Sequence, residues 1–412
     1  MYLVQLFPMV GFFLLAFKGG SFDLQAAVLS LAVPLVMGRF VRFTEKRWPI
    51  DRALLILVLF LVCVGLVTIK GVSVGNETPR TQAVYALVGL FTVPVGIIVM
   101  RKIRSWEKWA MWLAPLAILA LLAPWPLGRW HDGARNWVYI GSFSGQPSEF
   151  VKPLLVVILA AGLSNHPSFA KSAAWVGCAA ALCAILLWER DLGALLLYFI
   201  TTMLMYYAAT HNVPVTLAGF ACAAGGAVAA YKYLPYLRTR IAVWRNPWVS
   251  PYGSGFQIIQ SLTAIASGSW FGAGLGLGSP DSTPLIDSDL VFAAVTEEFG
   301  LVFSLGMIAI YGIILIRGLI IAQNSRNSFH ALTALGLSVF FGSQTALIIA
   351  GSTRLLPLTG ITLPLVARGG SSLVATMFSM GLLLGISSVN AEEEAADLHR
   401  IEVMGGEIRS QG

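Results

Sequence analysis

One acidic residue directly precedes a long apolar run, and its type and place suit acid–base chemistry. Asp289 lies in the segment Asp287-Ser288-Asp289-Leu290-Val291-Phe292. A carboxylate at the boundary between water and lipid can act as a general base toward a hydroxyl group. The alternative is structural, because Asp is also a favoured N-cap, worth about 1 kcal/mol to a helix. Asp289 is therefore the candidate catalytic residue.

Two further clusters of charge begin apolar runs. Glu149 and Lys152 are three residues apart, so on a helix they share one face and can pair. Ionisable residues within membrane helices are costly and indicate function by default, but a structural ion pair that fixes helix packing is an equally good interpretation. Asp191, in Glu189-Arg190-Asp191-Leu192-Gly193, is interpreted first as a helix cap and second as a chemical group.

The composition indicates which elements position these residues. Of 412 residues, 57% are hydrophobic and 11% are charged, whereas soluble domains carry about 25% charged residues. A soluble domain could not cover its surface with so few charges, and disordered chains are poor in apolar residues. In lipid, backbone groups must be bonded within helices or closed barrels. We therefore expect an all-α, polytopic membrane helix bundle.

Twelve apolar runs approach the roughly 20 residues that cross a bilayer. They lie near residues 2–17, 24–40, 53–69, 82–100, 109–127, 150–164, 172–188, 192–209, 214–233, 290–321, 331–350 and 372–390. No positive segment precedes the first run, which favours a membrane helix over a cleaved signal peptide.

Basic residues predict the orientation. Two short loops are rich in them, and the positive-inside rule places both loops in the cytoplasm. These loops contain Arg39, Arg42, Lys46, Arg47 and Arg52, and Arg101, Lys102, Arg104 and Lys108. Twelve spans then put both termini inside, and we expect the tail after Asn390 to be a solvated cytoplasmic end.

Nearly half of the basic residues fall on the outer side, more than a simple positive-inside protein would place there. The net charge is +7, from 27 basic and 20 acidic residues, and this topology places 13 of the 27 outside. Long loops translocate regardless of charge, which explains part of the excess. The shorter outer loops nevertheless contain Arg135, Arg190, Arg354 and Arg368. Together they predict an outward cavity for a phosphate or pyrophosphate.

The long outer segment contains alternating glycines at Gly272, Gly274, Gly276 and Gly278. No strand precedes them, so they are not a dinucleotide-binding motif. We expect a close backbone approach or a re-entrant bend, which protein or water must cover. No cluster of Cys and His has the spacing of a metal site, so no metal ligands are predicted.

Seven motifs in order over residues 130–390 resemble the SEDS family (shape, elongation, division and sporulation), the FtsW/RodA/SpoVE-type peptidoglycan polymerases. The motifs are Gly133-Ala134-Arg135-Asn136-Trp137, Gln146-Pro147-Ser148-Glu149-Phe150-Val151-Lys152, Asp191-Leu192-Gly193, Asn246-Pro247-Trp248, Gly255-Phe256-Gln257-Ile258-Ile259-Gln260-Ser261, Asp289-Leu290-Val291-Phe292 with Glu297-Glu298, and Leu356-Pro357 through Gly369-Gly370-Ser371-Ser372. The resemblance implies a ten-helix core with about two extra N-terminal spans, as in an actinobacterial-type member.

The resemblance also implies a reaction. Such proteins polymerise lipid II outside the bacterial cytoplasmic membrane, in elongation, division or sporulation. The acceptor's GlcNAc 4-hydroxyl attacks C1 of the donor MurNAc with inversion, and undecaprenyl pyrophosphate leaves. Asp289 matches the essential aspartate. The substrate-binding candidates are Arg135, Glu149, Lys152, Arg238, Arg240, Arg245, Gln257, Gln260, Ser371 and Ser372.

Partners and domains follow from the same resemblance. The expected partners are lipid II, membrane lipid and a class B penicillin-binding protein, with no nucleic acid; a divalent cation such as Mg or Mn could share the pyrophosphate's charge. We expect N-terminal helices at 1–128, a catalytic core at 129–390 with a large extracellular loop at 234–289, and a cytoplasmic tail at 391–412. A lipid II translocator and a non-catalytic scaffold for the transpeptidase are the alternatives.

Four positions depart from the family pattern. Ala367-Arg368 stands where Ser-Tyr is usual before Gly-Gly-Ser-Ser, Arg190 replaces a Pro, and Ile348 replaces an Asn. The arginine at 368 suits a pyrophosphate site.

Overall fold

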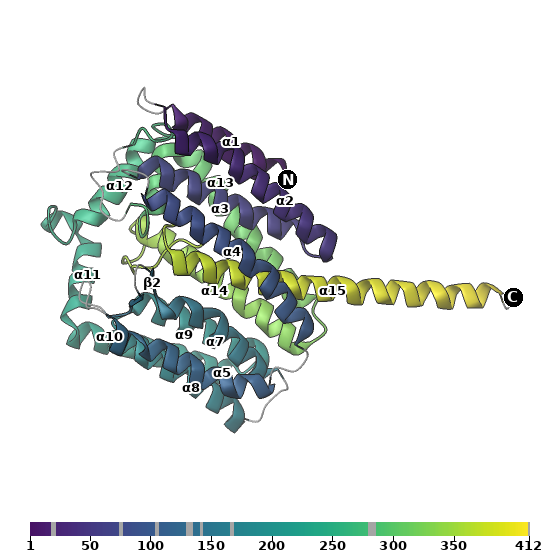
Figure 1. Ribbon diagram of the computed structural model, residues 1–412. Helices are drawn as coiled ribbons and strands as arrows, with labels where there is room; N and C mark the ends of the chain where they lie inside the picture. Colours follow the sequence, from purple (N-terminus) through teal and green to yellow (C-terminus); the bar gives the residue numbers. More distant parts are fainter. Residues whose placement is uncertain are drawn as a thin grey trace.

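The computed structural model is a bundle of long helices, most of which run along one common direction, with a small hairpin near one end (Figure 1). It describes residues 1–17, 22–73, 77–103, 107–128, 135–140, 143–164, 169–278 and 286–410. A helix occupies each of the twelve apolar runs, which confirms the all-α fold. These helices are α1 (Tyr2–Ala16), α2 (Leu24–Arg47), α3 (Arg52–Val72), α4 (Glu77–Lys102), α5 (Glu107–Leu122), α7 (Pro147–Leu163), α8 (Phe169–Trp188), α9 (Leu192–Thr210), α10 (Val213–Tyr233), α13 (Val291–Gln323), α14 (Ser328–Ser352) and α15 (Gly370–Ser410).

Ten helices in the described part of the chain are long and apolar enough to cross a membrane. The other two are α1, with 15 residues, and α7, with 17. A span needs about 17–25 residues, so α1 falls short of that range and α7 lies at its lower limit. The predicted count of twelve therefore holds for the helices, and ten of them have the length and composition of a span.

Helix α15 runs through the bundle and continues well beyond it (Figure 1). The segment after Asn390, expected to be a solvated tail, is its continuation. Glu392 on this continuation lies 2.7 Å from Arg101 at the end of α4, and Asp397 pairs with Arg326 between α13 and α14. The boundary expected at residue 390 falls inside one helix that is anchored by ion pairs.

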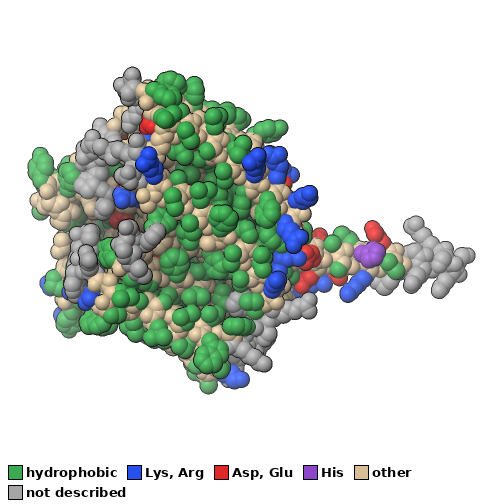
Figure 2. Space-filling model, in the orientation of Figure 1, with side chains coloured by type: hydrophobic (Ala, Val, Ile, Leu, Met, Phe, Trp, Pro, Cys, Tyr) green, Lys and Arg blue, Asp and Glu red, His purple; other side chains and the backbone are tan. Residues whose placement is uncertain are grey.

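The surface has the character of a membrane protein. Figure 2 shows hydrophobic side chains over most of the visible lateral face, with Lys and Arg gathered where α15 leaves the bundle. The ends of the helices agree, since α2 ends at Arg47, α3 begins at Arg52 and α4 ends at Lys102.

Two glycines allow α4 and α15 to pack closely through the middle of the bundle. A Cβ on Gly96 of α4 would lie 2.7 Å from the backbone of Gly381, and one on Gly381 would lie 2.5 Å from the Val93 carbonyl oxygen. Small residues bring membrane helices together in this way. The contact fixes α15 against α4, and both helices contribute to the cavity described below.

The segment before α13 is largely helical, with α11 (Pro235–Arg245), the 3-10 turn η2 (Pro247–Val249) and α12 (Phe256–Gly268). After α12 the chain turns back against a break in α13. Gly300 has φ +84°, and the N–H groups of Leu301 and Val302 bond instead to Ser269 O at 2.9 Å and Trp270 O at 3.2 Å. The turned-back segment thus accepts the hydrogen bonds that the break would otherwise leave unmade, and buried backbone groups require such partners.

The alternating glycines allow the turned-back segment to approach the backbone of α13 this closely. Gly272 has φ +86°, and a Cβ there would lie 2.2 Å from the Glu298 carbonyl oxygen. Ala273 N–H donates to Glu297 O at 2.8 Å. The predicted close backbone approach is confirmed.

Candidate functional site

A polar cavity of about 600 Å³ lies at the hairpin end of the bundle. Its walls come from α4, the hairpin β1 (Val138–Ile140) and β2 (Phe143–Gly145), α7, the N-terminus of α9, the segment before α13, and the segment that leads into α15. Five of the predicted site residues line it, namely Glu149, Lys152, Asp289, Ser371 and Ser372. Because Gln82 and Tyr85 of α4 also line it, the cavity is not confined to the core expected at 129–390.

A buried ion pair forms one wall of the cavity. Lys152 Nζ lies 2.6 Å from Glu149 Oε2, and each side chain is only 8% exposed. The ammonium also donates to Gln344 Oε1 of α14 at 3.1 Å and lies 5.5 Å from the centre of the Phe340 ring. The pair predicted from the spacing is confirmed. Its ammonium is held by α7 and α14 together.

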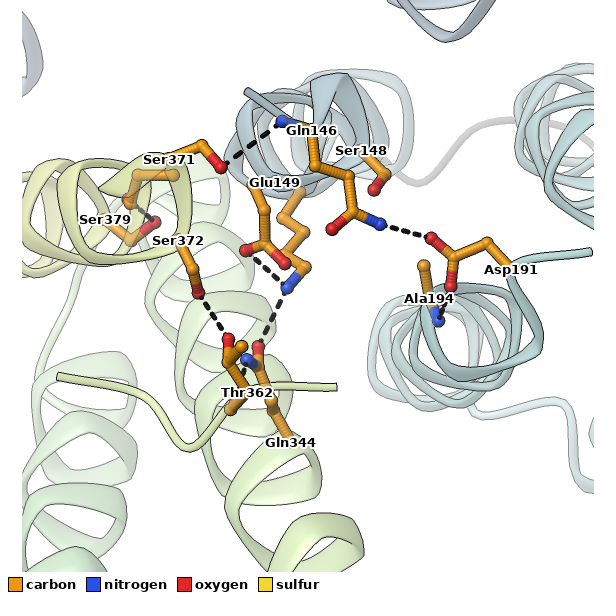
Figure 3. A network of polar contacts seen from close by, with 12 residues as sticks. Gln146, Ser148, Glu149, Asp191, Ala194, Gln344, Thr362, Ser371, Ser372 and Ser379 are labelled. Carbon is orange, nitrogen blue, oxygen red and sulfur yellow. Dashed lines mark hydrogen bonds and ion pairs between the residues drawn. The ribbon is translucent and has the colours of Figure 1, made fainter. Parts of the chain in front are cut away.

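The hydrogen bonds continue from this pair to the start of α15 (Figure 3). Gln344 Nε2 donates to Thr362 O at 2.8 Å, and Thr362 Oγ1 donates to Ser372 Oγ at 2.9 Å. The Gln146 N–H, just before α7, donates to Ser371 Oγ at 3.3 Å. The two serines therefore link α15 to α7 and to the segment that follows α14.

Asp191 caps α9 and also faces the cavity. Its Oδ1 accepts from the Ala194 N–H at 3.0 Å, which confirms the predicted cap. Its Oδ2 accepts from Gln146 Nε2 at 2.6 Å (Figure 3). It also accepts from Asn136 Nδ2 at 3.4 Å. Burial raises the pKa of this carboxyl, although the hydrogen bonds from the Ala194 N–H and from Asn136 oppose the shift. Its hydrogen bonds are consistent with a structural role.

Asp289 differs from Asp191 because it does not cap its helix. The N-cap of α13 is Leu290, with no side-chain cap bond. No residue in the described part of the chain donates a hydrogen bond to the Asp289 carboxylate. A Cβ on Gly360 would lie 3.9 Å from Asp289 Oδ2, so glycine leaves space beside the carboxylate. Burial raises the pKa of Asp289 to about 6; Arg240 opposes this shift and Asp287 adds to it.

The remaining predicted residues lie outside the cavity wall. Arg135 Nε donates to Gly128 O at 3.2 Å, and the guanidinium lies 5.6 Å from the Trp125 ring. Arg240 Nη1 reaches Thr359 O at 3.4 Å, next to the cavity residue Gly360. Arg238 and Arg245 are exposed on α11, and Gln257 and Gln260 are half-buried on α12. Of this group, Arg240 alone is placed to act on Asp289 through its charge.

Sequence reasoning missed several residues that the structure brings to the site. Gln82 and Thr362 line the cavity, and Gln344 holds Lys152. A polar amide inside an otherwise apolar run was the available signal for Gln82 and Gln344. Arg368 lines the cavity as part of an ion pair with Asp287 at 2.9 Å. Its partner here is thus a carboxylate of the protein, whereas the sequence analysis expected a phosphate or pyrophosphate.

An apolar groove of about 600 Å³ adjoins the polar cavity. Side chains of α4, α5, α7 and α15 line it, among them Val84, Val88, Phe150 and Val374. Residues common to both walls are Tyr85, Ser144, Gly370 and Ser371. The site therefore offers adjoining polar and apolar compartments to one ligand.

The described residues contain no cluster of three His, Cys, Asp or Glu side chains that could hold a metal ion. The described side chains thus do not form a preassembled metal site.

Comparisons with known proteins agree with this arrangement. The FtsW/RodA/SpoVE family model, described as "cell cycle protein", matches residues 51–392. The peptidoglycan glycosyltransferase RodA of Mycobacterium tuberculosis is 33% identical over 399 residues, which cover 89% of this chain and 83% of the relative. Stage V sporulation protein E of Bacillus subtilis is 32% identical over 365 residues, covering 84% of this chain and 98% of the relative.

Solved structures show the same fold. A chain from a peptidoglycan synthase complex that coordinates polymerization and crosslinking superimposes with a TM-score of 0.71 at 27% identity, covering 83% of this chain and 98% of that one. RodA of Thermus thermophilus gives 0.59 at 24% identity, covering 82% and 97%. The matched residues 51–392 include ten of the twelve long helices and leave α1 and α2 outside. The chain belongs to the FtsW/RodA/SpoVE family.

Proposed function

We propose that the protein is a peptidoglycan glycosyltransferase that polymerises lipid II into glycan strands on the outer face of the bacterial cytoplasmic membrane. The observation that supports this most is the Asp289 carboxylate. It lines a polar cavity, its pKa is raised by burial to about 6, and it caps no helix. Such a group is suited to accept a proton near neutral pH.

In this proposal Asp289 removes the proton from the acceptor's sugar hydroxyl as that oxygen attacks C1 of the donor. The donor already carries a pyrophosphate leaving group, which departs without protonation. One carboxylate therefore suffices, whereas glycosidases need a second carboxyl group to protonate the leaving oxygen. Asp191 is bonded to Gln146 and Asn136 and is left with a structural task.

Fixed cations stabilise the negative charge that the leaving group gathers. Lys152 is the candidate inside the cavity, and Glu149 and Gln344 hold its ammonium in place. Arg240 is the candidate near Asp289. We assign Ser371, Ser372, Gln257 and Gln260 to polar contacts along the substrate. Arg135, Arg238 and Arg245 complete the cations proposed for the approaching pyrophosphate.

The adjoining compartments suit a substrate with a polar head and a polyprenyl tail. The head occupies the cavity beside Asp289, and the tail lies in the apolar groove between α4, α5, α7 and α15. Burial of the tail contributes about 25 cal/mol per Å² of apolar surface and anchors the head.

We also propose that both termini are cytoplasmic and that a class B penicillin-binding protein is the partner. The basic ends of α2, α3 and α4 on the side where α15 leaves the bundle support this orientation. The likeness to a chain from a peptidoglycan synthase complex supports the partner.

The test uses purified protein with its cognate transpeptidase and labelled lipid II in detergent. The wild type should form glycan strands, and Asp289→Asn should form at least about 100-fold less product, the usual contribution of a general base. Glu402→Gln, at an exposed position late in α15, is the control and should retain activity. Undiminished polymer from Asp289→Asn would show that Asp289 is not the general base. Absence of polymer from the wild type would contradict the proposed polymerase activity itself. Absence of polymer from the wild type, with Asp289→Asn complementing a deletion strain, would favour a scaffold.

A further inference from the structure

Arg368 and Asp287 join two segments of the chain that meet beside Asp289. The Arg368 N–H donates to Asp287 O at 2.7 Å, and Arg368 Nη1 lies 2.9 Å from Asp287 Oδ2. Arg368 thus contacts Asp287 through both its main-chain N–H and its guanidinium group. The Asp287 side chain is 18% exposed, whereas that of Arg368 is 54% exposed. Both residues line the polar cavity.

The segment around Arg368 is itself anchored. Gln82 of α4 donates from Nε2 to Ala367 O at 3.3 Å and accepts from the Gly369 N–H at 3.4 Å. Leu365, three residues before Arg368, has φ +68°, in the left-handed region that favours glycine. A residue held in such a conformation needs support from its surroundings, and the bonds to Gln82 and Asp287 supply it. Arg368 therefore connects α4 to the segment that carries Asp289.

We propose that Arg368 is a positioning residue, which clamps Asp287 and keeps the charge of this second carboxylate neutralised two residues away from Asp289. This inference rests on the proposed role of Asp289 as the general base. It gives the arginine a task other than contact with the substrate, and the ion pair with Asp287 is the observation behind it.

The contact between Arg368 and Asp287 matters because nearby charges shift the pKa of Asp289. The charged or titratable side chains around the cavity are Arg240, Asp287, Arg368, Glu149, Lys152, Asp191, Tyr85 and Tyr139. Glu149 and Lys152 neutralise each other as a pair. Burial, the largest cause, raises the pKa of Asp289; Arg240 lowers it and Asp287 raises it further. An unpaired Asp287 would therefore hold the base in its protonated form to a higher pH.

The test is the acidic limb of the pH–rate profile for lipid II polymerisation by the complex with the transpeptidase. Arg368→Gln leaves Asp287 uncompensated, so the limb should move to higher pH by on the order of half a pH unit. Asp287→Asn leaves an uncompensated arginine, so the limb should move to lower pH. The double variant Arg368→Gln/Asp287→Asn is neutral at this pair, as the wild type is, and should return the limb to its wild-type position.

Arg368→Lys is the conservative variant. It keeps the charge and should leave the limb in place, although maximal rate falls because lysine cannot reproduce the guanidinium geometry. Lower rates in all four variants with an unmoved limb would reduce the pair to a structural contact and overturn the inference. Asp289→Asn separates this failure from that of the proposed function. If Asp289→Asn is active, the general-base role is wrong; if it is inactive and the limbs do not move, the clamp alone is wrong.

Discussion

Lys152 Nζ and Glu149 Oε2 lie 2.6 Å apart in a wall shared by α7 and α14, with each side chain 8% exposed. The two residues belong to one helix turn, and Gln344 reaches them from another helix. The contact can serve helix packing, substrate binding or both, and the two roles respond differently to substitution.

Breaking this pair from one side should destabilise the protein strongly. Lys152→Met leaves a buried carboxylate without its cation, a change that typically costs about 3–5 kcal/mol. The melting temperature in detergent should therefore fall. The double variant Glu149→Gln/Lys152→Met removes both charges and should recover most of that loss. If it recovers polymerisation as well, the pair is structural only, and Lys152 does not contact the pyrophosphate.

The pH dependence of polymerisation should report the Asp289 carboxyl. Its pKa of about 6 lies above the value of an ordinary aspartate, because burial disfavours the charged form. A general base must be deprotonated, so the rate should be high above pH 7, half-maximal near pH 6, and falling below that. Initial rates across pH 4.5–8.5, in buffers where the wild type stays folded, provide the measurement. An acidic limb near pH 4 would contradict the buried environment.

Substitution of Arg240 should weaken lipid II binding more than substitution of Arg238 on the same helix. Arg240→Ala removes a cation next to the cavity and should raise the apparent KM for lipid II several-fold without lowering the melting temperature. It should also move the acidic limb upward, because Arg240 opposes the rise in the pKa of Asp289. Arg238→Ala is the matched control, since Arg238 is likewise exposed on α11. Equal effects of the two substitutions would indicate a diffuse electrostatic contribution.

Gly272 should tolerate no side chain. In Gly272→Ala the new Cβ would meet the Glu298 carbonyl oxygen at 2.2 Å in a backbone with φ +86°. Strain of this kind costs on the order of 1–3 kcal/mol and should lower the melting temperature. Gly306→Ala within α13 is the control, because a Cβ there meets nothing within 4 Å, and it should be neutral or slightly stabilising. A tolerated Gly272→Ala would mean that the turned-back segment can move away from α13.

Local features of the site were predictable from the sequence. The Glu149–Lys152 pair depends on a spacing of three residues on one helix, and the Asp191 cap depends on a bond to Ala194 N. The lengths of the apolar runs likewise predicted all twelve helices. Each of these follows from a few neighbouring residues and from helix geometry.

Contacts between distant segments were not predictable in this way. The hydrogen bond from Lys152 to Gln344 joins residues 192 positions apart, and the ion pair of Arg368 with Asp287 joins residues 81 apart. The sequence did not show how the cations of the long segment are arranged, because it did not show that they lie on one helix, α11. Residues 238 and 240 are about 200° apart around α11, since each residue turns about 100°. Their side chains therefore leave the helix in different directions, and Arg240 is the one whose charge lowers the pKa of Asp289.

The unbroken course of α15 has a mechanical consequence. Ser371 and Ser372 stand in its first turn at the polar cavity, and the same helix ends at Ser410, 41 residues in total. At 1.5 Å per residue it is a rod of about 60 Å, longer than a bilayer's hydrocarbon core. Arg101 and Arg326 hold acidic residues in the second half of this helix, so a tilt imposed on that half displaces the serines in the first turn. Contacts at the start of α15 and contacts in its second half are thus mechanically coupled through one continuous helix.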